Sequence, residues 1–116
     1  MTIRNLSPQD VLTRLKADEI TLIDVREPDE YAAERIHGAL LFPLSTFDAH
    51  ALPHDDGKPI VFHCGSGIRS VKAIEKCRAA GLPQDSHLAG GLKAWKTAGL
   101  PTIAIDPATG RLREGR

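Results

Sequence analysis

The sequence has few cysteines, no excess of charge of either sign and no long apolar run. Its 15 basic and 15 acidic residues cancel, which removes any bulk electrostatic attraction to nucleic acid or to a membrane surface. No stretch approaches the roughly 18 apolar residues of a membrane span, and the N-terminus carries no apolar core of signal-peptide length. We therefore expect a cytoplasmic protein that binds no nucleic acid and has no membrane segment in this chain.

The two cysteines, Cys64 and Cys77, are not expected to form a disulfide. Cys77 lies roughly 13 Å of helical rise beyond Ile68, at the start of the helix predicted after Cys64. A disulfide needs Cα atoms within about 7 Å of each other. Cys77 also shares an apolar stripe with Val71 and Ile74, as core-facing residues of a helix do. We interpret it as a small buried hydrophobe in a reducing compartment.

The composition is that of one soluble domain, with 116 residues of which 41% are hydrophobic and 26% charged. Strand patterns alternate with helical ones, which predicts a mostly parallel sheet with helices on both faces. The predicted strands are 20–25, 40–42, 60–63 and 86–88. The predicted helices are one capped by Ser7 and four at 28–34, 45–51, 67–80 and 91–98, with a turn at 54–57. Residues 107–116 are polar without an apolar period, so we expect a domain over 1–106 followed by a mobile tail.

The most informative segment, residues 60–70, reads Ile-Val-Phe-His-Cys-Gly-Ser-Gly-Ile-Arg-Ser. It predicts a strand, a tight loop that opens with Cys64, and the first turn of a helix. We expect the thiol to be exposed and the N–H groups of the loop and first turn to point toward it. Such donors stabilise a thiolate and lower its pKa. Gly65 and Gly67 can adopt positive φ, which lets successive N–H groups converge into an anion-binding nest.

Charged and polar side chains accompany this loop. Arg69 lies five residues after Cys64 and one turn into the helix, where it could fold over the loop or meet an anionic substrate. Ser66 and Ser70 add hydroxyl donors. Between positions 58 and 80 there are five basic residues and one acidic residue, a surrounding that would attract an anionic substrate.

Segment 64–70 resembles the active-site loop of the rhodanese (sulfurtransferase) family, which reads Cys-x-x-Gly-x-Arg followed by Ser or Thr. Segments 22–31, 36–39 and 90–101 resemble other signatures of that family in the same order, with His37 in place of the usual proline. The resemblance covers nearly the whole chain. It implies a rhodanese-like three-layer α/β sandwich with a central sheet of about five strands.

The resemblance also implies an activity, in which a sulfane sulfur passes from a donor to an acceptor through a persulfide on Cys64. The implied catalytic residues are Cys64 and Arg69. The implied substrate-binding residues are Gly65, Ser66, Gly67, Ile68 and Ser70. The implied partners are a small anionic donor, such as thiosulfate or a persulfide, and a thiol, protein or cyanide acceptor. We expect no cofactor or metal, and a monomer or weak homodimer.

Two other kinds of function stay open at this point. Phosphatases and arsenate reductases of the same fold are one alternative, although phosphatases of this kind place five residues between cysteine and arginine. Here four residues separate Cys64 from Arg69, which favours a sulfur atom over a tetrahedral phosphate. The other alternative is a non-enzymatic sulfur carrier or regulatory module.

The remaining polar candidates favour structural roles. Asp24 and Arg26 end a strand at the same edge as the loop and are expected to bond to each other or to loop N–H groups. Glu30 and Tyr31 are also interpreted as structural. His63 should point to the opposite face of its strand from Cys64, as a hydrogen-bonded core histidine. The other histidines show no ligand constellation: His37, His50, His54 and His87.

Overall fold

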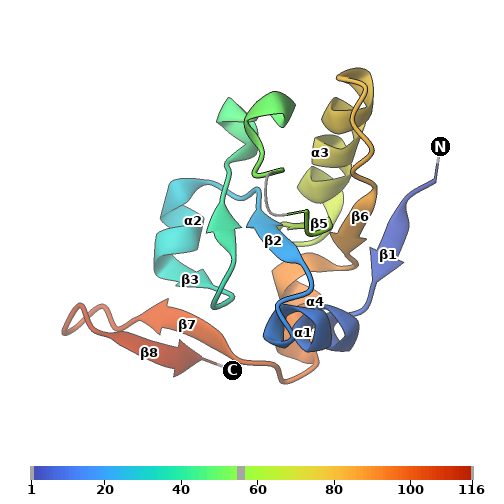
Figure 1. Ribbon diagram of the computed structural model, residues 1–116. Helices are drawn as coiled ribbons and strands as arrows, with labels where there is room; N and C mark the ends of the chain where they lie inside the picture. Colours follow the sequence, from blue (N-terminus) through green and yellow to red (C-terminus); the bar gives the residue numbers. More distant parts are fainter. Residues whose placement is uncertain (1, 55–56, 116) are drawn as a thin grey trace.

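The computed structural model describes residues 2–54 and 57–115, and its centre is a five-stranded parallel sheet (Figure 1). The strands follow the order β1, β6, β5, β2, β4, and all neighbouring pairs are parallel. Their bounds are β1 (Arg4–Leu6), β2 (Thr21–Asp24), β4 (Leu40–Leu41), β5 (Ile60–His63) and β6 (Ser86–Leu88). This arrangement confirms the predicted α/β fold with a mostly parallel sheet of about five strands.

Helices cover both faces of the sheet (Figure 1). One face packs against α1 and α4, and the other against α3 and the short 3-10 turn η2. The bounds are α1 (Pro8–Lys16), α2 (Pro28–Ala33), α3 (Ile68–Ala79), α4 (Gly91–Thr97), η1 (Leu44–Thr46) and η2 (Ala49–Ala51). The sheet and its two helical layers are the three layers of the predicted sandwich.

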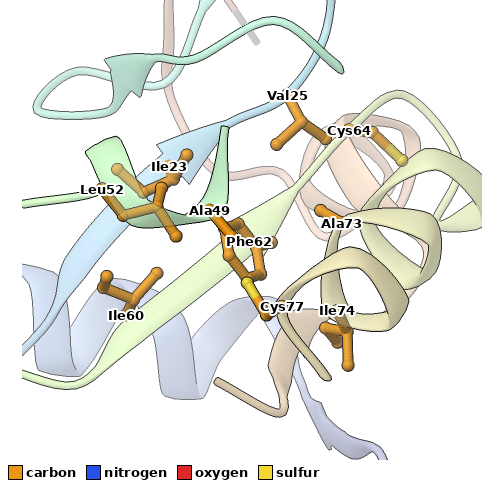
Figure 2. Packing of buried hydrophobic residues seen from close by; sticks show 10 residues of the cluster. All are labelled: Ile23, Val25, Ala49, Leu52, Ile60, Phe62, Cys64, Ala73, Ile74 and Cys77. Carbon is orange, nitrogen blue, oxygen red and sulfur yellow. The ribbon is translucent and has the colours of Figure 1, made fainter. Parts of the chain in front are cut away.

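Successive residues of β5 pack on opposite faces, as the period of two in a strand requires. Phe62 belongs to a buried cluster that includes Ile74 and Cys77 of α3 (Figure 2). Val61 belongs to the cluster on the other face, which includes Trp95 of α4. Because β5 is covered on both faces, all four of its residues are buried. This rigid central strand fixes the position of the residue that follows it, Cys64.

The predicted helix at 45–51 is wrong. The chain forms two separate 3-10 turns there, η1 and η2. Between them Asp48 is extended, with φ −127° and ψ 108°, and its carboxylate accepts a hydrogen bond from the His50 N–H at 3.0 Å. Aspartate competes for backbone donors in this way at helix starts, which interrupts a continuous helix.

The polar residues after 106, expected to be a mobile tail, include a strand. Strand β8 (Leu112–Gly115) pairs antiparallel with β7 (Thr102–Ile105), which pairs in turn with β3 (Glu34–Arg35). A turn closed by the Gly110 N–H on the Asp106 carbonyl, at 2.7 Å, joins β7 to β8. Backbone pairing holds this hairpin, which extends away from the central sheet (Figure 1), and Leu112 stays 56% exposed. No buried apolar period therefore marks β8 in the sequence.

Two other expectations concern the ends and surfaces of this fold. The predicted turn at 54–57 includes residues 55 and 56, which lie outside the described residues. Within the described residues, none of the helices is both long and apolar enough to cross a membrane.

Candidate active site

The loop that follows β5 returns directly into α3 and places Cys64 at the turn. Gly67 is the N-cap of α3, with φ +104°, so the predicted left-handed glycine is confirmed at this position. Gly65 does not have positive φ, and that part of the prediction is wrong. Gly65 instead leaves room for the side chain of Arg69, because a Cβ at position 65 would lie 3.2 Å from Nη2 of Arg69.

Backbone N–H groups surround the Cys64 sulfur. The N–H of Gly67 donates to Sγ at 3.1 Å and that of Ser70 at 3.4 Å, while the Ser70 hydroxyl lies 3.7 Å away. Burial by itself would raise the pKa of the thiol. The hydrogen bonds from Ser70, from Gly67 and from the Ser66 backbone outweigh that effect, so the pKa of Cys64 lies below its usual value. These donors stabilise the thiolate relative to the neutral thiol.

The prediction of an exposed thiol is wrong, because Cys64 has 0% of its surface exposed. Its side chain lies at the edge of the core cluster, beside Val25 and Ala73 (Figure 2). The start of α4 covers the loop from outside, where the N–H of Leu92 donates to the Cys64 carbonyl at 2.8 Å and that of Lys93 to the Gly65 carbonyl at 3.0 Å. The sulfur is therefore closed off from solvent in this structure.

The side chain of Arg69 forms an ion pair with the carboxylate of Glu30. Its Nη1 and Nη2 donate to Oε1 and Oε2 of Glu30 at 2.6 and 3.0 Å. This hydrogen-bonded pair lowers the pKa of Glu30 to about 2 and raises the pKa of Arg69. Glu30 also accepts from the Glu27 N–H at 3.0 Å, in the capping box of α2. The guanidinium folds over the loop as predicted, and Glu30 has the structural role predicted for it.

The other predicted loop residues divide between surface and interior. Ser66 and Ile68 are exposed, Ile68 by 67%. Ser70 is buried, and its hydroxyl lies 3.2 Å from the Gly67 carbonyl. Of the N–H groups expected around the sulfur, those of Ser66 and Gly67 in the loop and of Ser70 in the first turn of α3 contribute.

A second polar group lies beneath the loop at the ends of β2 and β5. Asp24 accepts hydrogen bonds from the backbone N–H of Arg26 at 3.0 Å, from its Nε at 3.0 Å and from its Nη2 at 2.8 Å. Burial opposes the charge on Asp24, but bonds from His63 and Arg26 hold the pKa of this carboxyl far below its ordinary range. The buried His63 ring lies 3.3 Å from the Cys64 carbonyl through Nδ1. The expected bond between Asp24 and Arg26 and the expected burial of a hydrogen-bonded His63 are thus present.

Sequence reasoning missed one residue of this site, His87 in β6. Its Nδ1 lies 2.8 Å from the Ser70 hydroxyl and its Nε2 lies 2.7 Å from Oδ1 of Asn5. His87 pairs in register with Phe62, so it shares a sheet face with Phe62 and with Cys64 two residues on. His87 could have been found from the sequence only if the pairing of residues 86–88 with β5 had been predicted, since that pairing places it opposite Phe62.

Neither of the two main surface cavities is lined by Cys64. A cavity of about 750 Å³ lies elsewhere, lined by residues of α1 and β2 and by Trp95 and Ile103. A shallower hollow of about 560 Å³ lies outside the loop, lined in part by Ser66 and Lys93. Within the part of the chain that the structure describes, no group of three or more His, Cys, Asp or Glu residues is arranged to hold a metal ion.

Comparison with known families agrees with the fold. The model of the rhodanese-like domain matches residues 7–98. The chain belongs to the rhodanese-like family. Its rhodanese-like domain is 27% identical to that of the Alr3790 protein from Anabaena sp., in a solution NMR structure. The two superpose with a TM-score of 0.74 over 96% of this chain and 89% of the other.

Relatives of this rhodanese-like protein include proteins with and without a stated activity. An uncharacterized protein from Synechocystis sp. is 42% identical over 98 residues, which are 84% of this chain and 55% of that protein. The chain thus spans about half the length of that relative. A protein named sulfurtransferase from Allochromatium vinosum is 31% identical over 87 residues, which are 75% of this chain and 81% of the other.

Proposed function

We propose that this rhodanese-like protein is a sulfurtransferase that carries sulfur as a persulfide on Cys64. The observation that carries the proposal is the pair of N–H groups, from Gly67 and Ser70, directed at a sulfur whose pKa is lowered. A thiolate is the nucleophile that attacks a sulfane sulfur. The relative named sulfurtransferase supports the same class of reaction.

The first half-reaction loads the sulfur. The Cys64 thiolate attacks the outer sulfur of a small anionic donor, such as thiosulfate or a persulfide. A new S–S bond forms while the S–S bond of the donor breaks, and the leaving group departs with the electron pair as sulfite or a thiolate. Atoms and charge balance without a cofactor, because no net oxidation accompanies the exchange.

The second half-reaction transfers the bound sulfur from Cys64 to an acceptor. A thiol, a sulfur-accepting protein or cyanide attacks the outer sulfur, and Cys64 leaves as a thiolate. The N–H groups of Gly67 and Ser70 stabilise the negative charge on Sγ as it returns, in the manner of an oxyanion hole. The remaining loop positions would line the sulfur site: Gly65, Ser66 and Ile68.

Arg69 has a positioning role in this proposal. Its two bonds to Glu30 tie the first turn of α3 to α2, which fixes the loop that carries the N–H donors. The four-residue spacing between Cys64 and Arg69 favours a single sulfur atom over a phosphate group. A dedicated sulfur carrier would use the same persulfide and differ only in its acceptor.

Intact mass measurement tests the proposal directly. After incubation with thiosulfate, the wild-type protein should gain the mass of one sulfur atom, and cyanide should remove it as thiocyanate. Cys64→Ser should gain nothing, whereas Cys77→Ser, which changes the other cysteine, should still gain the atom. A protein that stays unmodified by thiosulfate and persulfide donors yet hydrolyses an aryl phosphate would favour the phosphatase alternative instead.

A further inference from the structure

A chain of side chains leads from the buried sulfur toward the surface at β1. Cys64 Sγ lies 3.7 Å from the Ser70 hydroxyl, which lies 2.8 Å from Nδ1 of His87. On the other side of the ring, Nε2 of His87 lies 2.7 Å from Oδ1 of Asn5, an exposed residue. Cys64 and Ser70 are fully buried and His87 is 4% exposed. These contacts thus link the buried thiol to an exposed residue through two side chains.

The order of donors follows from Asn5. Its Oδ1 can only accept, so Nε2 of His87 carries the hydrogen and Nδ1 of the neutral ring carries a lone pair. That lone pair accepts the hydroxyl proton of Ser70. The Ser70 oxygen then offers a lone pair of its own to the S–H of Cys64. Each donor in the chain thus faces an acceptor.

Building on the proposed sulfurtransferase function, we propose that His87, acting through Ser70, takes up the proton of the Cys64 thiol, and that Asn5 fixes the tautomer that allows it. The S–H proton moves to the Ser70 oxygen while the Ser70 hydroxyl proton moves to Nδ1. The products are a thiolate and an imidazolium, and no electrons are transferred. His87 is thus a positioning residue that touches no substrate.

The surroundings of His87 suit this role. Burial lowers the pKa of His87, which favours the neutral ring over the imidazolium. From β1 it faces Asn5, from α3 it faces Ser70, and from the loop it faces Gly67, whose added Cβ would lie 3.8 Å from the ring. None of these is charged. Among the described residues, these hydrogen bonds of His87 connect it to one titratable group, Cys64, through Ser70.

A purely structural histidine would be arranged differently. It would carry its hydrogen on Nδ1 and donate it to Ser70, whose hydroxyl would point permanently at the Gly67 carbonyl, 3.2 Å away. In that arrangement Nδ1 cannot accept a proton, and the thiol of Cys64 would titrate independently of the ring.

Nitrogen NMR of the imidazole distinguishes the two tautomers in the wild-type protein. Long-range proton–nitrogen correlations at neutral pH should show the hydrogen of His87 on Nε2. The exposed His50 serves as the internal reference for a solvated ring. A hydrogen found on Nδ1 overturns the proposal.

Alkylation of Cys64 measures the coupling. The rate of reaction with iodoacetamide, followed against pH by mass spectrometry, reports the thiolate. His87→Asn keeps a hydrogen-bonding group near Ser70 but cannot take up a proton. It should move the midpoint of the profile to higher pH and slow alkylation at pH 7 by roughly 2–10-fold, the worth of one hydrogen bond. The matched change His50→Asn should leave the profile unchanged.

Ser70→Ala removes the middle of the chain while its backbone N–H still reaches the sulfur, and it should give the same displacement as His87→Asn. Profiles of His87→Asn and wild type that coincide would overturn the proposal. Neither readout needs a sulfur donor. A protein that fails to form a persulfide but shows the displaced profile would therefore refute the proposed function and leave the role of His87 in place.

Discussion

Arg69 and Glu30 face each other across two hydrogen bonds, with Nη1–Oε1 at 2.6 Å and Nη2–Oε2 at 3.0 Å. Glu30 lies in α2 and Arg69 in the first turn of α3, so the pair joins two elements that are distant in the sequence. Only about a third of each side chain is exposed. The position of the Cys64 loop thus depends on a helix that contributes no group to the sulfur itself.

Arg69→Ala should slow persulfide formation by about tenfold or more while the protein stays folded, because the loop loses its bidentate anchor. Arg69→Lys should restore only part of the rate, since one ammonium cannot form both bonds. Rapid-quench measurement of sulfur loading gives the rate, and circular dichroism checks the fold. Arg14→Ala, at an exposed arginine of α1, is the control. Equal loading rates in all variants would contradict the anchoring role.

The same pair should make stability depend on acid pH. The pKa of Glu30 is depressed from 4.5 to about 2, so its contribution is complete above pH 4.5 and is lost as the pH falls toward 2. Glu30→Gln should cost about 1 kcal/mol or less at pH 7, because the pair is partly exposed. That difference should shrink between pH 5 and pH 2 in urea unfolding. A difference that stays constant over this range would show that the ion pair does not stabilise the fold.

Gly91 should not tolerate a side chain. It has φ +61°, and a Cβ there would lie 2.4 Å from the Cys64 carbonyl oxygen. Gly91→Ala should therefore push α4 off the loop, with a loss of about 2 kcal/mol or more in unfolding free energy and slower sulfur loading.

Gly81→Ala is the matched control for this change. Gly81 has φ +77°, but nothing lies within 4 Å of its added Cβ. It should cost about 1–2 kcal/mol from backbone strain alone and leave loading intact. Similar effects of the two substitutions, measured by chemical denaturation and by mass spectrometry, would argue against close packing at Gly91.

Cys77→Ala should lower the unfolding free energy by about 1–2 kcal/mol and leave the reactivity of Cys64 unchanged. Cys77 is fully buried, and burial raises its pKa to about 11, so it holds almost no thiolate at neutral pH. Iodoacetamide at pH 7.5 should label the folded wild-type protein once, at Cys64. Labelling at Cys77, or loss of sulfur loading in a stable Cys77→Ala variant, would overturn this assignment.

A chain that ends at Asp106 should keep the fold and the site, because β8 belongs to the small second sheet and pairs with no strand of the central one. It retains β7 with its partner β3 and removes β8, whose strand pairing is with β7. Its melting temperature should stay within a few degrees of that of the full chain, and sulfur loading should be unchanged. If the shortened chain fails to fold, the hairpin is an integral part of the domain.

The segment from β5 through Cys64 to α3 could be predicted because its signals are local. An apolar run, two glycines and a helical stripe follow one another within one short stretch, and each acts on its immediate neighbours. Strands β1 and β3 could not be predicted in this way. Arg4–Leu6 pairs with Ser86–Leu88 from the other end of the chain, and β3 has only two residues, so neither carries a periodic pattern.

The burial of Cys64 and the contact of His87 also depend on residues distant in sequence. Leu92 and Gly91 close the loop from α4, and the register of β6 beside β5 aims His87 at Ser70. A local pattern gives the type of the loop but not what packs against it. Local patterns alone therefore predict an exposed Cys64 and give no sign that His87 lies close to it.

Because Cys77 is buried and unreactive, Cys64 has no resolving thiol among these 116 residues. Both cysteines are free, and the sequence contains no third. A persulfide at Cys64 therefore cannot be displaced by a second thiol of these residues to give an internal disulfide. Its outer sulfur is removed only by a nucleophile from another molecule. The same isolation means that a sulfenic acid at Cys64 would depend on small-molecule thiols to escape irreversible over-oxidation.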